Sequence, residues 1–457
     1  MKHIDIVSLF EDAKYRNEEI TVCGWVRTAR DSKNMAFLEI NDGTTLKHLQ
    51  IVVDKQNFDD LSAYKLGSSV KIIGTLVDSV IMEGSVEVNA KEITLLGASG
   101  ADYPLQKKRS TLEYLRTIPE LRVRTNTFNA VFKVRNTISY AIHEFFQKRH
   151  FVYINTPIIT ASDCEGAGEM FRVTTQGYNH NAKTEEEYYK NDFFGKKAGL
   201  SVSGQLDGEV AAMAFGKIYT FGPSFRAENS NTPKHVAEFW HIEPEIAFAE
   251  LPDLIEIAED MIKYIINAVL KNCPDELQFF NKFVEKGLIE KLESVVNSKF
   301  EIVDYTKAIE LLKNSGKDFQ YPVEWGEDIQ TEHEKFLTEE IFKKPIFVTN
   351  YPKAIKSFYM KQNPDGKTVA ATDLLVPGVG EIIGGSEREA DYDKLIKAMK
   401  DKNMDMNEYN DYIALRKFGS VPHSGFGLGL ERIVMYITGM KNIRDVILYP
   451  RTVGDIK

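Results

Sequence analysis

One short segment of the chain carries side chains that could hold a nucleotide beside a small polar molecule. It is GPSFRAENSNTPKHVAEFWHIEPE, residues 222–245. Alternating apolar residues at both ends and turn-forming residues in the middle predict an antiparallel hairpin. The arms would carry Arg226 and Glu228 on one side and Phe239, Glu243 and Glu245 on the other. An arginine can bind a phosphate through two hydrogen bonds, and a phenylalanine ring can stack on a purine. A ladder of surface ion pairs would use the same residues, so the hairpin alone leaves both interpretations open.

A glycine-rich segment near the end of the chain strengthens the first interpretation. PHSGFGLGLERIVMYITGMKNIRDVILYPR, residues 422–451, predicts a strand that runs into a helix with Arg432 just inside it. Gly425, Gly427 and Gly429 are expected to let a ligand approach the backbone closely. The segment lacks the GKS or GKT ending of a phosphate-binding loop, and no helix follows it in a βαβ unit.

Together these segments resemble two signature motifs of the class II aminoacyl-tRNA synthetases. FRAE with the EFWHIEPE arm is similar to motif 2, and GLGLER is similar to motif 3. A helix-period segment from Phe132 to Arg149, followed by FVYINTP with Pro157 at its end, resembles motif 1. The resemblance covers nearly the whole chain and is close to the aspartyl/asparaginyl/lysyl subgroup, within which the chain looks like the asparaginyl branch. It implies an α+β catalytic domain, built on an antiparallel sheet flanked by helices, and a homodimer formed through motif 1.

The N-terminal part predicts a small β-barrel. Five short strands separated by Asp-Gly, Gly-Ser and Glu-Gly turns favour an OB-fold, which is a platform for single-stranded nucleic acid. Phe37 is the candidate for base stacking, and Arg27 and Gln50 lie on neighbouring strands with hydrogen-bond donors. By the resemblance, Phe37 and Gln50 match positions that read the central anticodon uridine. A single aromatic residue is more often part of a core, and that alternative for Phe37 stays open.

The predicted organisation has three parts. Residues 1–100 form the OB-fold anticodon-binding domain, 101–126 a basic hinge, and 127–457 the catalytic domain, with a helical insertion around 273–343. Between Ala101 and Arg135 there are eight basic and three acidic residues, although the whole chain has a net charge of -10. This local excess favours a hinge that binds phosphate, and a solvated linker is the alternative.

Composition fits a large enzyme. The chain has 457 residues, of which 43% are hydrophobic and 27% charged, so two or three domains with ample core are expected. No apolar run is long enough to cross a bilayer, and acidic residues interrupt the first segment where a signal peptide needs apolar ones, so we expect a cytoplasmic protein without a membrane partner. Cys23, Cys164 and Cys273 lack the spacing of a zinc site or a disulfide framework.

Three further segments supply candidates for the amino-acid and metal sites. They are DCEGAGEMF at 163–171, SVSGQLDGE at 201–209 and ATDLLVPGVGEIIGGSERE at 371–389. Asp373 and Glu381 could face a triphosphate, where two carboxylates need a counter-ion that Mg²⁺ provides. By the resemblance, Glu165 binds the α-ammonium of the substrate with Ser203 and Gln205 nearby. Arg388 matches the arginine that holds the side-chain carbonyl of the amino acid.

The resemblance implies ATP-dependent ligation of L-asparagine to tRNA(Asn). The asparagine carboxylate would attack the α-phosphate of a bent ATP, and the adenylate would then react with the 3′-terminal ribose of the tRNA. Positioning and charge neutralisation supply most of the rate in such a reaction. The expected roles are Arg226 on the α-phosphate, Arg432 on the γ-phosphate, Phe239 on the adenine ring, Glu228 on the adenine amino group, Gly429 in the ATP site, and Glu381 on the magnesium ion.

Two positions favour asparagine over aspartate. Aspartyl enzymes of the subgroup carry a lysine three residues after the glutamine of SPQ or SGQ, and here that position is Gly208. Glu243 can accept hydrogen bonds from an amide and repels a second carboxylate. The alternatives are an aspartyl enzyme with relaxed tRNA choice, a tRNA-binding paralogue that does not charge tRNA, and an asparagine synthetase of the same fold. The paralogue is disfavoured because Arg226, Glu381 and Arg432 are all present, and the synthetase because it normally lacks the anticodon module.

Overall fold

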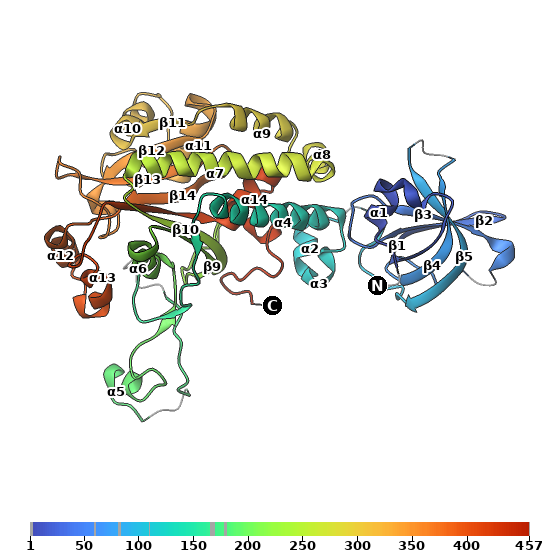
Figure 1. Ribbon diagram of the computed structural model, residues 1–457, viewed down its shortest axis with the longest axis horizontal. Helices are drawn as coiled ribbons and strands as arrows, with labels where there is room; N and C mark the ends of the chain where they lie inside the picture. The colour runs from blue at the N-terminus through green and yellow to red at the C-terminus, as the bar shows by residue number, and fades with distance from the viewer. Residues whose placement is uncertain are drawn as a thin grey trace. The chain divides into compact units, whose positions relative to one another are not determined.

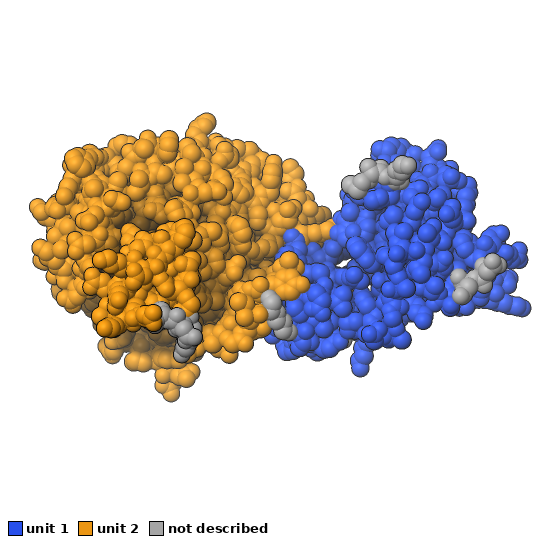
Figure 2. Space-filling view, turned by 90° about the horizontal axis from the view of Figure 1, so that it is seen from below, with its two compact units in different colours: residues 1–132 blue, residues 133–457 orange. Residues whose placement is uncertain are grey.

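A computed structural model describes residues 3–58, 61–80, 84–108, 110–164, 170–177 and 181–456. The chain divides into two compact units, Met1–Phe132 and Lys133–Lys457, which Figure 2 shows in different colours. One hydrophobic core cluster, which includes Ile6, Ile40 and Val88, lies within the first unit, and two others, around Tyr305 and Phe358, lie within the second.

The first unit contains the predicted five-stranded barrel. Its strands are β1 (Glu19–Asp31), β2 (Met35–Asn41), β3 (Leu49–Asp54), β4 (Ser69–Asp78) and β5 (Val86–Gly97). They close in the order β1-β2-β3-β5-β4. Apolar residues alternate along each strand and fill the interior, as in β3, where Leu49, Ile51 and Val53 are fully buried. Helix α1 (Ile6–Glu11) adds Ile6 and Leu9 to this core.

The segment predicted as a basic hinge contains two short helices, α2 (Leu112–Thr117) and α3 (Pro119–Arg122), and is followed by α4 (Asn126–Gln147). Arg122 is completely buried, with its guanidinium carbon 4.4 Å from the centroid of the Phe128 ring. Arg135 donates to the Glu431 carboxylate at 2.7 Å. Two of the eight basic residues therefore make contacts inside the protein. Neither a solvated linker nor a phosphate-binding linker accounts for Arg122 and Arg135.

The second unit is built on an eight-stranded sheet (Figure 1). Its strands lie in the order β11 (Glu301–Asp304), β12 (Ile346–Pro352), β13 (Thr368–Val376), β14 (Gly380–Glu387), β15 (His423–Gly429), β10 (Glu238–Ala247), β9 (Lys217–Phe225) and β6 (Val152–Tyr153). Neighbouring strands are antiparallel, except that β11 runs parallel to β12 and β6 parallel to β9. The predicted antiparallel sheet with flanking helices is confirmed.

Amphipathic helices cover this sheet. In α7 (Leu251–Asn272), Leu254, Ala258, Ile262 and Ile265 are buried at helical spacing, and the helix packs on β13, β14 and β15. Helix α14 (Leu430–Thr438) packs on β10 and β15, and α6 (Gln205–Phe215) packs on β9 and β10. The remaining helices are α5 (Glu185–Lys190), α8 (Pro274–Phe283), α9 (Leu288–Asn297), α10 (Tyr305–Lys313), α11 (Thr331–Lys335), α12 (Tyr392–Asp401) and α13 (Asn410–Ala414).

The region predicted as a helical insertion, residues 273–343, contains α8, α9, α10 and α11. It also contains strand β11, which the sequence did not predict, and this strand forms the edge of the sheet beside β12. Tyr305, Ala308 and Leu337 from this region share a core with Ile346 and Val348 of β12. The insertion is thus integrated into the sheet.

Two short strands, β7 (Ile159–Thr160) and β8 (Gly199–Leu200), pair with each other on either side of α5. In the described part of the chain, no helix is both long and apolar enough to span a bilayer.

Candidate functional site

The predicted hairpin is formed by β9 and β10, which pair from Phe225 with Glu238 to Lys217 with Ile246. Arg226 and Glu228 follow the end of β9, and the backbone N–H of Arg226 donates to the Ala237 carbonyl at 2.9 Å. The alternation of β10 sends His241, Glu243 and Glu245 to one side of the sheet. Phe239, Glu243 and Glu245 therefore lie on the predicted arm, whereas Arg226 and Glu228 lie just beyond the other strand, in the connection between the two.

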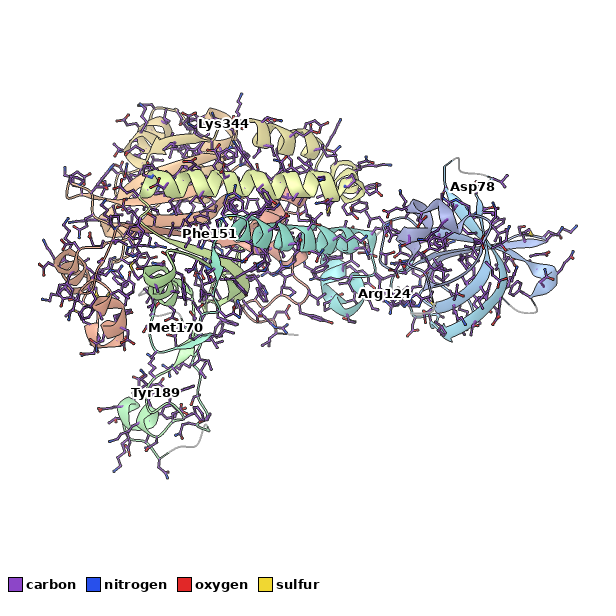
Figure 3. All side chains as sticks on the ribbon, in the orientation of Figure 1. Asp78, Arg124, Phe151, Met170, Tyr189 and Lys344 are labelled. Atoms are coloured by element: carbon purple, nitrogen blue, oxygen red, sulfur yellow. The ribbon has the colours of Figure 1, made fainter. Side chains whose placement is uncertain are left out.

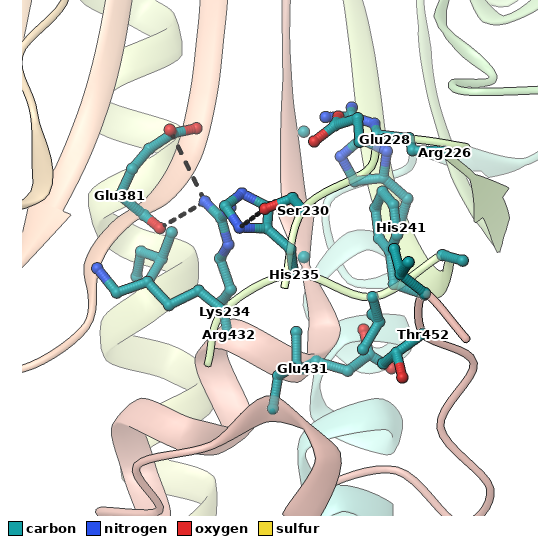
Figure 4. A pocket seen from close by; sticks show the side chains of 18 residues that line it. Arg226, Glu228, Ser230, Lys234, His235, His241, Glu381, Glu431, Arg432 and Thr452 are labelled. Carbon is teal, nitrogen blue, oxygen red and sulfur yellow. Dashed lines mark hydrogen bonds and ion pairs between the residues drawn. The ribbon is translucent and has the colours of Figure 1, made fainter. Parts of the chain in front are cut away.

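A pocket of about 270 Å³ lies between this hairpin, β14 and the start of α14 (Figure 4). Its lining includes every residue predicted to bind ATP, namely Arg226, Glu228, Phe239, Glu381, Gly429 and Arg432. The guanidinium carbon of Arg226 is 5.3 Å from the centroid of the Phe239 ring, so cation and aromatic face share one wall. Arg432 donates to the Glu381 carbonyl at 2.9 Å and lies 3.7 Å from the Glu381 carboxylate.

The loop between β9 and β10 is held over the pocket by the C-terminal segment. Backbone N–H groups connect Ile443 to the Pro233 carbonyl at 2.8 Å and Ala237 to the Arg451 carbonyl at 2.7 Å. Arg444 donates to the Asn231 side chain at 2.8 Å. Lys234 and His235 of this loop line the pocket, which the sequence analysis did not predict.

The two predicted magnesium ligands come from adjacent strands. A Cβ atom placed on Gly384 would lie 3.1 Å from Glu381 Oε1 and 3.5 Å from Asp373 Oδ1, so both carboxylates converge on the space that this glycine leaves open. Lys356 Nζ is 2.8 Å from Asp373 Oδ2. Among the described residues, no group of three or more histidine, cysteine or acidic side chains could hold a metal ion by itself. Two carboxylates fit an ion such as Mg²⁺, which keeps waters and shares substrate phosphate oxygens.

A third carboxylate reaches this region from the insertion. Glu334 of α11 lies 3.9 Å from Lys234 Nζ. Its Oε2 atom would be 2.2 Å from a Cβ on Gly380, a residue with a φ of +87°, so only glycine fits there. Burial and the nearby Glu381 carboxylate raise the pKa of Glu334 to about 7. The sequence shows no recognisable motif around Glu334, and this residue was not among those predicted to lie at the site.

The predicted amino-acid residues form a second cluster, which meets the pocket at His241. Nδ1 of His241 is 3.1 Å from Glu243, and His241 itself lines the pocket. Glu243 is 5% exposed and accepts hydrogen bonds from the Ser203 hydroxyl, from the Gly204 N–H at 3.0 Å and from the Thr220 hydroxyl at 3.0 Å. These donors use the acceptor positions of the carboxylate. In this structure Glu243 thus holds the turn that carries Ser203 and Gln205.

Arg388 is buried behind this turn and paired with Glu245. The Nη2 atom of Arg388 is 2.5 Å from Glu245 Oε1, and Nη1 donates to the Ser386 hydroxyl at 2.8 Å. Gln205 donates to Glu209 at 3.0 Å, and Arg416 and His423 contact the same fully buried carboxylate. The sequence did not predict the network formed by Glu209, Glu245 and Arg416. Charged residues within otherwise apolar strands and helices are the signal that could have indicated it.

Three glycines lie against side chains of β10. Gly208 borders Glu245, and Gly425 and Gly427 of β15 leave room for Glu245 and His241. A Cβ on Gly208 would lie 3.5 Å from Glu245 Cγ, so a longer side chain there would begin beside the Arg388–Glu245 pair. A Cβ on Gly425 would lie 2.1 Å from Glu245 Oε1, and one on Gly427 would lie 2.3 Å from His241 Nε2. At Gly425 this space is filled by the Glu245 carboxylate, whereas Gly427 and Gly429 line the pocket, with His241 bordering Gly427. Close approach of a ligand to the backbone at Gly427 and Gly429 stays a prediction. Glu165 lies outside the described residues.

The three residues predicted to bind the anticodon differ in how far their side chains are exposed and in how many hydrogen bonds they make within the barrel unit. Phe37 is partly exposed and lies outside the barrel core, between Ala36 and Leu38, which are buried in it. Gln50 donates to Glu87 at 2.9 Å. Arg27 donates to the Arg124 carbonyl and is 3.5 Å from the Asn41 side chain, so much of its hydrogen-bonding capacity is used inside the unit. The alternative that Phe37 is a core residue is not supported.

An antiparallel sheet that carries a pocket with two arginines, and a buried polar cluster beside that pocket, fits the catalytic unit of a class II synthetase, and a five-stranded barrel precedes it. The family described as tRNA synthetases class II (D, K and N) matches residues 112–453. The OB-fold nucleic acid binding domain matches residues 20–96. The chain therefore belongs to the class II tRNA synthetase family that comprises the D, K and N enzymes.

Individual relatives are similar over almost their whole length. The asparagine–tRNA ligase of Clostridium kluyveri is 56% identical over 459 residues, covering 99% of each chain. That of Clostridium tetani is 57% identical over 459 residues, also covering 99% of each chain. Among solved structures, the asparaginyl-tRNA synthetase from Pyrococcus horikoshii complexed with asparaginyl-adenylate has a TM-score of 0.88 and 32% identity, covering 100% of this chain and 99% of that chain.

Proposed function

We propose that this chain ligates L-asparagine to tRNA(Asn) in an ATP-dependent reaction that passes through asparaginyl-adenylate and releases AMP and pyrophosphate. The observation that carries the proposal is the junction at His241, where the pocket that contains Arg226, Phe239 and Arg432 meets the cluster around Glu243. The similarity to asparagine–tRNA ligases over nearly the full chain favours asparagine over the aspartyl alternative.

Each residue of the pocket is proposed to bind a different part of ATP during adenylate formation. Phe239 stacks on adenine and Glu228 accepts from its amino group. Arg226 binds the α-phosphate, where negative charge accumulates during attack by the asparagine carboxylate, and Arg432 binds the γ-phosphate. The rate then comes from alignment of the carboxylate with the phosphorus and from charges fixed in a partly buried site.

Asp373 and Glu381 are proposed to hold Mg²⁺ when ATP is bound. The ion would neutralise negative charge on the leaving pyrophosphate. The glycine at position 384 leaves both carboxylates open to the same space, and the Glu381 side chain is 42% exposed, so it can be reached from the pocket.

Selection of asparagine is proposed to rest on charge around a fixed turn. Ser203 and Gln205 contact the substrate together with Glu165, and Arg388 binds the side-chain carbonyl while Glu245 holds its guanidinium in place. Because protein donors occupy Glu243, its proposed effect is electrostatic. A buried carboxylate held ionised by these donors disfavours a second carboxylate from aspartate.

We also propose a homodimer that works in the cytoplasm, where its tRNA substrate is found. Strand β6 lies at the end of the catalytic sheet opposite to β11, with Val152 and Tyr153 each 40% exposed, and Tyr140 of α4 is 71% exposed. A second copy would cover these apolar side chains. In the barrel, Phe37, Gln50 and Arg27 are the proposed contacts to the anticodon.

Exchange of labelled pyrophosphate into ATP, measured separately with asparagine and with aspartate, tests the reaction. We expect exchange with asparagine alone and charging of tRNA(Asn) with asparagine. Exchange with aspartate alone would establish the aspartyl alternative, and absence of exchange would establish a tRNA-binding paralogue. Formation of free asparagine from aspartate and ammonia would establish a synthetase of the amino acid.

A further inference from the structure

The chain between β7 and β8 forms a small lobe on the catalytic unit, which we call the α5 lobe (residues 170–177 and 181–200). Figure 1 shows it projecting from the body of the unit, and Figure 3 labels Met170 near its base and Tyr189 on α5. Two segments of the chain form the base of the lobe and are joined by backbone hydrogen bonds. The N–H of Leu200 donates to the Phe171 carbonyl at 2.9 Å, and the N–H of Val173 donates to the Ala198 carbonyl at 2.9 Å.

The base of the lobe is connected directly to the catalytic site. The Ser201 carbonyl accepts from the backbone N–H of Phe225, at 2.9 Å, and Phe225 precedes Arg226. Two residues further on, Ser203 donates to Glu243. The base of the lobe is thus anchored to the strand that precedes Arg226 and to the turn that carries Ser203.

The turn that follows α5 is held by hydrogen bonds within the lobe. Oδ1 of Asp192 accepts from the Thr175 N–H at 2.9 Å, the Thr175 hydroxyl at 2.8 Å and the Phe193 N–H at 2.8 Å. Gln176 donates to the Asn191 carbonyl at 2.6 Å. The backbone of the turn is thus fixed before any ligand arrives.

This fixed turn presents two aromatic rings and two cations to solvent. Phe193 is 75% exposed and Phe194 is 47% exposed, with their ring centroids 4.8 Å apart in an edge-to-face arrangement. Gly195 has a φ of +66°, which lets the chain turn sharply, and Lys196 and Lys197 that follow are both exposed. The stretch from Phe193 to Lys197 contains no acidic residue.

The acids of the lobe are used elsewhere. Glu185, Glu186 and Glu187 lie in the first turn of α5, where the helix dipole favours them, and Glu187 also accepts from the Lys183 N–H at 2.8 Å. Adjacent aromatic faces and lysines are the combination that binds unpaired nucleotides, since every base can stack and every phosphate attracts a cation.

Resting on the proposed function, we propose that the turn from Phe193 to Lys197 binds the unpaired 3′-terminal nucleotides of tRNA and guides them toward the adenylate. Phe193 and Phe194 stack on bases, and Lys196 and Lys197 contact the phosphates. A nucleic-acid ligand accounts for the aromatic rings and the lysines at once, whereas an apolar protein partner would leave both lysines without a counter-charge.

The first test replaces both aromatic rings, with Phe193→Ala and Phe194→Ala in one protein. Loss of two base stacks should weaken tRNA binding at least roughly 30-fold, because each stack is worth roughly 5-fold or more, and fluorescence anisotropy with tRNA(Asn) measures the loss. Pyrophosphate exchange without tRNA reports on the pocket and should match the parent. Phe418→Ala, at a site 82% exposed outside the lobe, is the matched control and should leave the tRNA affinity as it was.

The second test uses salt dependence to identify the phosphate contacts. Lys196→Ala with Lys197→Ala should lower the slope of log Kd against log salt by up to about 1.4, which is roughly 0.7 for each single-strand phosphate contact. Lys402→Ala, an exposed lysine at the end of α12, should keep the parental slope. An unchanged slope in the double-lysine variant would overturn the phosphate contact.

The third test removes the ligand instead of the protein side chains. Transfer RNA that lacks its unpaired 3′ nucleotides should bind the parent and the double-phenylalanine variant equally well. If the variant still binds this truncated tRNA more weakly, or if it changes the oligomeric state in sedimentation, the turn contacts another surface and the proposal is wrong. Failure of asparagine-dependent exchange in the parent would instead contradict the proposed function.

Discussion

Glu243 and Glu334 have opposite pKa shifts because their neighbours differ. Burial alone would raise the pKa of Glu243, but the charge and hydrogen bond of His241, with donors from Ser203 and Gly204, outweigh it and hold the pKa at about 2. Burial also raises the pKa of Glu334, and there the Glu381 carboxylate adds to the rise, so that it reaches about 7. Glu243 is therefore a fixed charge near neutral pH, and Glu334 titrates there.

Replacement of Glu334 should change the pH dependence of stability. With a pKa raised from 4.5 to about 7, the folded protein binds more protons than the unfolded chain between these pH values. The free energy of unfolding therefore decreases as pH rises through this window, by up to about 3 kcal/mol from this group. Glu334→Gln should remove that decrease, so its urea midpoint should rise relative to the parent between pH 5 and pH 8.

An exposed glutamate of the same segment supplies the control for this measurement. Glu340→Gln should follow the parental curve at both pH values, since its side chain is in solvent. Parallel curves for Glu334→Gln and the parent would mean that Glu334 does not titrate in this window.

Glu243→Gln tests the charge proposed to exclude aspartate. The change keeps the shape of the side chain but removes the ionised acceptor of Ser203 and Gly204. The activation free energy that corresponds to kcat/KM for asparagine should rise by about 2–4 kcal/mol, and aspartate should compete better. Pyrophosphate exchange with each amino acid measures both effects, and Glu238→Gln at an exposed position of β10 is the control. An unchanged ratio of asparagine to aspartate would show that another residue selects the substrate.

At the scale of elements, strand β15 can lie against β10 only because two of its residues lack side chains. Glu245 pairs with Gly425 across the strands, and its carboxylate occupies the position of the missing Cβ. The same carboxylate holds Arg388. Strand packing and the position of a predicted substrate-binding arginine therefore depend on one glycine.

Gly425→Ala should displace Glu245 and, with it, Arg388. Overpacking of this kind costs about 1–3 kcal/mol of stability, and the KM for asparagine should rise more than the KM for ATP. Gly222→Ala on β9 is the control, because no atom lies within 4 Å of an added Cβ there, and it should stay within about 0.5 kcal/mol of the parent. Equal changes in the two KM values would show that Gly425 does not control the position of Arg388.

These elements also show which parts of the site the sequence could predict. Arg226, Phe239 and Arg432 belong to short segments in which alternation, turn residues and glycines mark strand, loop and helix start, so their convergence was predictable. Glu334 lies near two lining residues of the pocket, Lys234 and Glu381, and comes from a helix that carries no such pattern. It also approaches Gly380, which is far along the chain. The same limit applies to β11, which is only four residues long and pairs with β12 after more than forty intervening residues.

At the scale of the whole molecule, the barrel and the catalytic unit each have their own core. Transfer RNA is the ligand proposed to bind both the barrel and the catalytic unit, so a change on the barrel surface is expected to affect charging through tRNA binding. Phe37 is suited to test this separation because it is partly exposed and lies outside the barrel core. Phe58, which packs against that core, is a phenylalanine of the same unit with a structural role.

Phe37→Ala should leave tRNA-independent pyrophosphate exchange at the parental rate and raise the KM for tRNA roughly 5- to 100-fold, because one base stack is lost. Phe58→Ala should instead lower the unfolding midpoint of the barrel, since it removes apolar contacts from a core. Transfer RNA with a replaced central anticodon uridine makes the assignment specific. The parent should lose affinity for it, and Phe37→Ala should lose little more, because ring and base belong to one contact. A fall in exchange that parallels the fall in charging would show that Phe37 supports the fold, and an additive loss with the altered tRNA would move the uridine contact to another residue.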